Sequence, residues 1–129
     1  MVENTQVDES WIRSLLADWQ LIADLAFSDL VLWVPKRNKL TAYAHARPAA
    51  AATIFYRDIT GNLPRSDWQE TITQAWELGV VVVPQQVAQY EGSTTRVSAY
   101  PVYAKGSDSS ERPVAIITKH TNLGEARLP

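Results

Sequence analysis

The sequence predicts an α+β sandwich, in which a central antiparallel sheet of about five to six strands is flanked by helices. Three observations predict this class. The candidate hairpins are short, the candidate strands outnumber the helices, and no regular alternation of strand and helix runs through the 129 residues. A chain of this length fits a single domain, residues 1–129, and is long enough to bury a sizeable core.

The first predicted element is a helix from Trp11 to Phe27, because apolar residues recur there at three- and four-residue spacing. Its apolar face contains Trp11, Leu15, Trp19 and Ile22. These side chains either pack into the core or form the seam of a homodimer, and the seam is our functional hypothesis. Residues 1–9 are acidic and polar, and we expect them to form a flexible start.

A buried hairpin is predicted to follow this helix. Leu30–Val34 is a continuous apolar run rich in β-forming residues, which indicates a central strand covered on both faces. The charged segment Lys36–Lys39 predicts a turn with Asn38 in the left-handed conformation. Leu40–Arg47 is then predicted to pair as the second, antiparallel strand.

Alternation along this second strand predicts two different faces. Small residues share one face, where a helix can pack closely: Ala42, Ala44 and Ala46. Polar and aromatic residues share the other face, which we expect to be either the wall of a ligand pocket or a solvated surface: Thr41, Tyr43, His45 and Arg47.

The second half of the chain predicts one helix and further strands. The helix begins at Ser66, where Gln69 completes a capping box, and ends at Gly79. The other elements are a possible strand Thr53–Arg57, a short buried strand Val80–Val83, a loop Gln85–Thr95 and two strands, Arg96–Ala104 and Pro113–Lys119. Asn122 and Glu125 have the spacing of a second capping box, so residues 122–129 are expected to begin a linker helix of a longer protein.

Composition excludes several functions. Lys and Arg number 12 against 14 Asp and Glu, a net charge of −2 that argues against a nucleic-acid partner. The absence of cysteine excludes disulfides, thiol catalysis and thiolate metal sites. We find no phosphate-binding loop, no apolar run long enough to cross a membrane and no secretory signal, so we expect a cytoplasmic protein.

The two histidines are the general-base candidates with a near-neutral reference pKa. His120 follows the last strand and is predicted to be a surface residue. His45 is either a ligand-contacting residue or an ordinary sheet residue. No nucleophile motif accompanies them, and we expect no catalytic residue and no metal site in these 129 residues. The alternative is a small stand-alone enzyme that uses His45 with Arg47.

Several segments resemble the N-terminal sensor domain of the PdtaS-like family of actinobacterial sensor histidine kinases. The most specific is Trp19–Asp29, which reads Trp-Gln-Leu-Ile-Ala-Asp-Leu-Ala-Phe-Ser-Asp and runs into Leu30–Val34. Further similar segments follow in the same order: Arg47-Pro48, Thr53-Ile54, Asp58, Gly61, Arg96–Val102 and Pro113–Thr121.

The resemblance implies a GAF-like sensor domain, close to the PAS fold, in a cytoplasmic two-component kinase. It implies a homodimer formed by the terminal helices, and either a small-molecule ligand between sheet and helices or a domain that has lost ligand binding and acts only structurally. Six residues are then candidate ligand contacts: Tyr43, His45, Arg47, Tyr56, Arg57 and Tyr100. The implied transferase activity, with its ATP and Mg²⁺ and its response-regulator partner, would belong to the parent kinase, because the phosphoacceptor and ATP-binding regions are absent here. No cofactor is expected in this chain.

Overall fold

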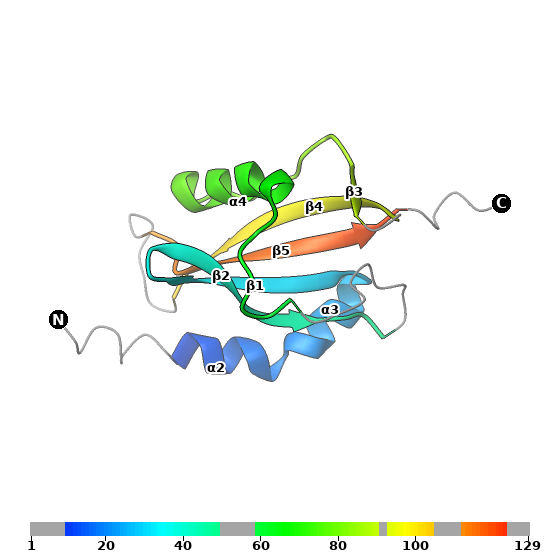
Figure 1. Cartoon of the computed structure of the whole chain (residues 1–129). Helices are drawn as coiled ribbons and strands as arrows, with labels where there is room; N and C mark the ends of the chain where they lie inside the picture. The colour runs from blue at the N-terminus through cyan, green and yellow to red at the C-terminus, as the bar shows by residue number, and fades with distance from the viewer. Residues whose placement is uncertain (1–9, 50–58, 91–92, 105–111, 124–129) are drawn as a thin grey trace.

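The computed structural model describes residues 10–49, 59–90, 93–104 and 112–123. An antiparallel sheet lies at its centre, with one helix on one face and two helices on the other (Figure 1). The strands are β1 (Asp29–Lys36), β2 (Lys39–Ala46), β3 (Ala88–Tyr90), β4 (Ser93–Val102) and β5 (Ala115–Asn122), and the helices are α2 (Ser10–Ala17), α3 (Trp19–Ala26) and α4 (Ser66–Leu78). Their arrangement confirms the predicted α+β class.

Four long strands and the three-residue β3 follow the order β2-β1-β5-β4-β3, with every neighbouring pair antiparallel. The expected flexible start, the possible strand Thr53–Arg57 and residues 124–129 lie outside the described residues. Asn122 is the last residue of β5. The helix expected to begin there therefore stays a prediction.

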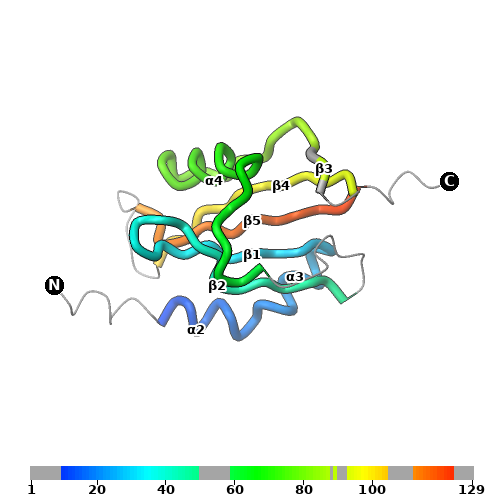
Figure 2. The backbone as a smooth tube through the Cα atoms, viewed as in Figure 1, coloured from blue at the N-terminus to red at the C-terminus, as the bar shows by residue number. Residues whose placement is uncertain are grey.

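Each face of the sheet has its own hydrophobic core, and β1 contributes side chains to both cores. Val31 and Trp33 point towards α4, whereas Leu30 and Leu32 point towards α3. All four are at most 3% exposed, which confirms the prediction of a strand covered on both faces. Figure 2 shows the sheet running between the two helical layers.

A β-bulge changes the predicted faces of β2. Leu32 pairs with Ala44 while Trp33 pairs with Ala42, so Tyr43 is an extra residue without a partner in the register. Ala42 therefore joins the core under α4, whereas Ala46 and Ala44 pack in the core on the α3 side. The prediction of a single alanine face was wrong, because one inserted residue reverses the alternation.

The predicted first helix is two helices. Asp18 separates α2 from α3 with φ −110° and ψ 12°, outside the helical region. The Asp18 N–H donates to the Leu15 carbonyl in a tighter turn, and the Asp18 carbonyl accepts the Ile22 N–H that starts α3. Asp has a low helix propensity, but Asp24 lies within α3, so propensity alone does not place the break at Asp18.

The ends of α4 were predicted with unequal success. Gly79 ends α4 in the left-handed conformation, as predicted. The capping box was wrong, because the N-cap residue is Arg65, whose side chain makes no capping hydrogen bond. Gln69 instead donates to the carbonyl of Pro64 at 3.2 Å.

Both edges of the sheet are partly covered by backbone bridges. Val82 exchanges two hydrogen bonds with Ala99 of β4, and Ala42 of β2 bonds with Gly61 and Asn62. The predicted strand Val80–Val83 was wrong beyond that single bridge, since three of its valines are about half exposed. The predicted loop Gln85–Thr95 contains β3 and the start of β4.

The contact between Gly79 and Tyr103 gives a stability prediction. Gly79 has φ +68°, and a Cβ there would overlap the Tyr103 hydroxyl oxygen, which itself donates to the Gly79 carbonyl at 3.0 Å. We expect Gly79→Ala to lower the free energy of unfolding by about 2 kcal/mol, from left-handed strain and loss of this hydrogen bond. Urea denaturation measures it.

The Tyr103→Phe background isolates the steric part of this effect. Without the hydroxyl, the nearest ring atom lies 3.7 Å from the added Cβ. Gly79→Ala should then cost only about 1 kcal/mol, the strain of the backbone conformation alone. An equal cost in both backgrounds contradicts the packing described here.

Candidate functional site

Four polar side chains meet on the α4 face of the sheet, near the start of β1. Asp29, His45, Thr118 and His120 come from three neighbouring strands, and register brings them together: Asp29 pairs with His120, and Val31 pairs with both His45 and Thr118. Alternation along each strand places all four side chains on one face.

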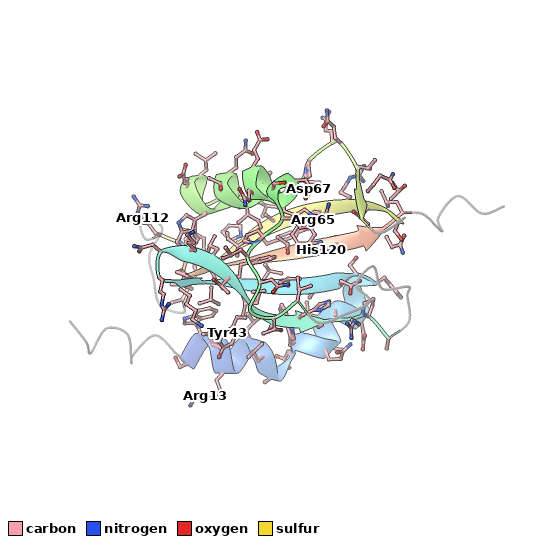
Figure 3. The ribbon with its side chains drawn as sticks, in the orientation of Figure 1. Arg13, Tyr43, Arg65, Asp67, Arg112 and His120 are labelled. Carbon is pink, nitrogen blue, oxygen red and sulfur yellow. The ribbon has the colours of Figure 1, made fainter. Side chains whose placement is uncertain are left out.

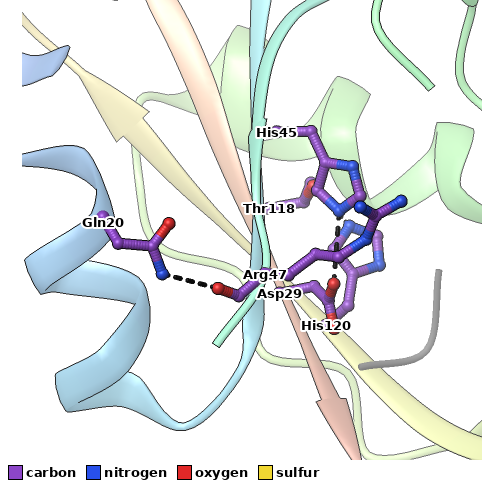
Figure 4. A network of polar contacts seen from close by, with 6 residues as sticks. All are labelled: Gln20, Asp29, His45, Arg47, Thr118 and His120. Carbon is purple, nitrogen blue, oxygen red and sulfur yellow. Dashed lines mark hydrogen bonds and ion pairs between the residues drawn. The ribbon is translucent and has the colours of Figure 1, made fainter. Parts of the chain in front are cut away.

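An ion pair joins two of these side chains away from solvent. His45 Nε2 lies 3.2 Å from Asp29 Oδ2, and their side chains are 2% and 0% exposed. Figure 4 shows this contact from close by. A buried carboxylate needs such a partner, because an uncompensated charge in the interior is costly.

The other two side chains belong to a chain of buried donors and acceptors. The Trp33 indole N–H donates to the Thr118 hydroxyl oxygen at 2.8 Å, and that oxygen lies 2.7 Å from Nε2 of His120. The indole can only donate, and the hydroxyl can turn either its proton or its second lone pair to Nε2, according to the tautomer of His120.

His120 is fully buried, and the prediction of a surface histidine was wrong. Figure 3 shows it between the sheet and α4, where the Trp68 ring lies edge-on at 4.8 Å between centroids. Desolvation by burial lowers its pKa from 6.5 to about 3, although the Asp29 carboxylate acts in the opposite direction. The alternation Ile116, Thr118, His120 was the sequence signal that indicated burial.

Hydrogen bonds between side chains of α3 and the backbone that follows β2 connect this end of the sheet with the opposite face. Gln20 Nε2 donates to the Arg47 carbonyl at 2.6 Å and to Asp24 Oδ1 at 3.0 Å. The same Asp24 oxygen accepts the Ala49 N–H at 2.8 Å. Two side chains of α3 therefore hold the backbone on either side of Pro48, just after β2 ends. Figure 4 shows the first of these contacts, from Gln20 to Arg47.

The predicted ligand contacts divide between the two faces. The structure brings His45 and Arg47 to the same end of β2, with the Arg47 side chain on the side of the two imidazoles (Figure 4). Tyr100 points to the opposite face, where the Lys119 ammonium lies 6.0 Å from its ring centroid. Tyr56 and Arg57 lie outside the described residues.

Tyr43, the bulge residue, lies apart from the other predicted ligand contacts, closer to the turn of the β1–β2 hairpin. It is 49% exposed and lines an open cavity of about 400 Å³ together with Val34, Pro35 and Gly61. Sequence reasoning also missed Asp29, Thr118, Trp33 and Gln20. An isolated acidic residue beside an apolar run was the available signal for Asp29.

The four predicted seam residues differ in exposure. Trp19 is buried against the sheet, and Trp11 and Leu15 are half-buried in the same core. Ile22 is 36% exposed and lies on the outer side of α3. Leu21 and Leu25, which were not predicted, are 56% and 72% exposed.

Among the residues that the structure describes, no three His, Cys, Asp or Glu side chains are grouped so that they could hold a metal ion. No helix among the same residues has the length and apolar character needed to cross a membrane.

The lowered pKa of His120 predicts a pH-dependent stability. The unfolded chain binds a proton at His120 near pH 6.5, whereas the folded chain binds it only near pH 3. The unfolded state therefore binds more protons between these values, and the free energy of unfolding should fall by up to ~1.4 kcal/mol per pH unit below 6.5. Urea denaturation at several pH values measures this slope.

A His120→Gln variant, which lacks the group, should show a shallower decline over the same interval. An NMR titration of the native protein provides the readout without a mutation. Uptake of a proton by the folded His120 imidazole above pH 5 contradicts the assignment.

The comparisons place the chain among known proteins. Residues 3–129 match the family described as "Histidine kinase PdtaS, GAF domain". The chain is 32% identical over 133 residues to "Sensor histidine kinase PdtaS" of Mycolicibacterium smegmatis, which covers 99% of this chain and 25% of that protein. It is 27% identical over 115 residues to the protein of the same name from Mycobacterium tuberculosis, covering 84% of this chain and 22% of that one.

A solved structure supports the same fold. "Sensor region of a sensor histidine kinase" superposes with a TM-score of 0.64 at 23% identity, over 98% of this chain and 40% of that one. The chain thus spans about a quarter of the length of the curated relatives that it matches. By its sequence and its fold, the chain belongs to the GAF domain family of the PdtaS sensor histidine kinases.

Proposed function

We propose that this domain is the sensory and dimerisation unit of a cytoplasmic two-component histidine kinase. In this proposal it takes a small anionic ligand beside Arg47 and passes the signal to the helices of the opposite layer. The observation that carries the proposal is the 2.6 Å hydrogen bond from Gln20 to the Arg47 carbonyl. This bond connects Arg47, the residue best suited to bind an anion, directly to α3.

The end of β2 has the chemistry for an anion. Arg47 is exposed, and its planar guanidinium can bind carboxylate or phosphate oxygens in pairs. His45 stands two residues earlier on the same face, and its Nε2 lies 3.2 Å from Asp29 Oδ2. The Asp29 carboxyl is thus already engaged within the protein beside the proposed anion site.

Two elements are positioned to transmit a shift at this end of the sheet. Gln20 and Asp24 tie the chain around Pro48 to α3, and Asp29 pairs in register with His120 of β5. Beyond β5, the linker helix expected from Asn122 onwards would carry the movement towards the next domain. A ligand can drive this only by binding two conformations with different affinities.

The homodimer seam of this proposal runs along the outer side of α3. Of the two predicted seam residues in α3, Trp19 is buried and Ile22 is 36% exposed. The exposed side chains of Leu21 and Leu25 enlarge the apolar surface around Ile22. Trp19 packs in the core of its own chain and would support the seam from beneath. The seam and Arg47 are thus connected through α3.

Kinase activity belongs to this proposal only through the parent protein. ATP and Mg²⁺, and the response regulator that receives the phosphoryl group, would act at regions outside these 129 residues. The alternative of a stand-alone enzyme using His45 and Arg47 has one supporting observation, the Asp29–His45 pair. It is weaker because the His45 side chain is 2% exposed, which leaves little access for a substrate.

Light scattering on two variants tests both parts of the proposal. A thermal-shift screen with inorganic phosphate, nucleotides and cyclic dinucleotides first selects the anion that raises the melting temperature most. Ile22→Asp should abolish self-association, because a carboxylate would be buried in the seam. If the signal reaches α3, the selected anion should change the self-association of the unchanged protein. Arg47→Gln should preserve self-association but abolish this effect of the anion.

Leu78→Asp is the matched control, because Leu78 is 68% exposed on the opposite helical layer. It should leave both self-association and the anion response unchanged. An unchanged mass for Ile22→Asp rules out this seam, and an unchanged anion response for Arg47→Gln rules out this ligand site.

A further inference from the structure

A cavity separate from the one at Tyr43 lies at the turn end of the β1–β2 hairpin, away from Arg47. It has a volume of about 380 Å³ and opens between the hairpin turn and the C-terminal half of α4. Lys36 pairs with Lys39 at this end, whereas Leu30 pairs with Ala46 at the end that carries Arg47. Six residues of strand separate the two ends, which is about 20 Å.

The inner wall of this cavity is apolar and belongs to the core. Leu40 and Trp76 pack at the edge of the core under α4, where Ile72 is 2% exposed. Leu63, which is 51% exposed, lines the same space. A cavity of this size with an apolar wall fits a small molecule with an apolar group of a few carbon atoms.

One basic and one acidic side chain line the same cavity and form no ion pair with each other. Lys39 belongs to β2 and Glu77 to the last turn of α4. Within the described segments, neither side chain takes part in an ion pair or a hydrogen bond. The cavity therefore offers one cation and one anion to an occupant.

The hairpin turn adds a reason for an anion beside Lys39. Arg37 and Asn38 both have positive φ, 54° and 67°, so the turn is tight and holds Lys36 opposite Lys39. Like charges directly opposite on two strands repel. A carboxylate bound at Lys39 would relieve that repulsion, whereas Glu77 favours an ammonium group on the other side.

We propose that this cavity binds a free α-amino acid with an apolar side chain. The ligand carboxylate contacts Lys39, its ammonium group contacts Glu77, and its side chain packs against Leu40, Ile72 and Trp76. The site goes beyond the function proposed above, because it lies at the far end of the hairpin from Arg47 and selects a zwitterion rather than an anion.

Isothermal titration of the 129-residue chain with L-leucine tests the proposal. We expect saturable binding that weakens at least tenfold in Lys39→Gln and in Glu77→Gln, since each removes a charged hydrogen-bond partner. L-leucinamide, which lacks the carboxylate, N-acetyl-L-leucine, which lacks the ammonium, and glycine, which lacks the apolar side chain, should each bind at least tenfold more weakly. The indole NMR signal of Trp76 should shift on addition of L-leucine.

Glu70→Gln is the matched control, because Glu70 lies on the same helix but does not line this cavity. It should bind L-leucine as the unchanged protein does, and so should Arg47→Gln. Melting temperatures confirm that each variant is folded. Absence of saturable binding at millimolar L-leucine overturns the proposal, and so does equal binding by the three analogues or by the two charge variants.

Because the Arg47→Gln variant is measured in both experiments, the failure of one proposal can be distinguished from the failure of the other. Loss of the anion response with leucine binding intact leaves the zwitterion site standing. Loss of leucine binding in Lys39→Gln with the anion response intact shows that the two proposed sites act independently.

Discussion

The hydroxyl group of Thr118 is the point on which the buried centre of the domain depends. It accepts a hydrogen bond from Trp33 of β1 and lies within 2.7 Å of His120 on its own strand. All three side chains are fully buried. Since a buried donor or acceptor without a partner costs about 1–3 kcal/mol, one hydroxyl satisfies two groups that would otherwise oppose folding.

This polar chain also determines what lies above and beside it. Trp68 of α4 packs edge-on against both Trp33 and His120, so the position of α4 follows from the orientation of these rings. Asp29 pairs in register with His120 and holds His45 on the neighbouring strand. From there β2 leads to Arg47 and its contact with α3. One continuous set of contacts therefore crosses the sheet from the α4 layer to the α3 layer.

How much the sequence could predict depended on whether a feature was local. The apolar run of β1 predicted a strand covered on both faces, and Gly79 and Asn38 predicted left-handed residues, because one residue type decides each feature. The bulge at Tyr43 depends on pairing with a neighbouring strand, which a single sequence does not specify, whereas the burial of His120 had only the alternation along its own strand as a local signal. The Asp29–His45 pair joins residues 16 positions apart through register alone, and so it was missed.

The measurement that tests this account most directly compares two substitutions of one residue. Thr118→Ser keeps the hydroxyl and Thr118→Val keeps the shape, so their difference isolates the hydrogen bonds. The account predicts that Thr118→Val lowers the free energy of unfolding by about 2–4 kcal/mol, while Thr118→Ser lowers it by about 1 kcal/mol or less. Equal losses for the two variants would contradict the central role given to the hydroxyl group.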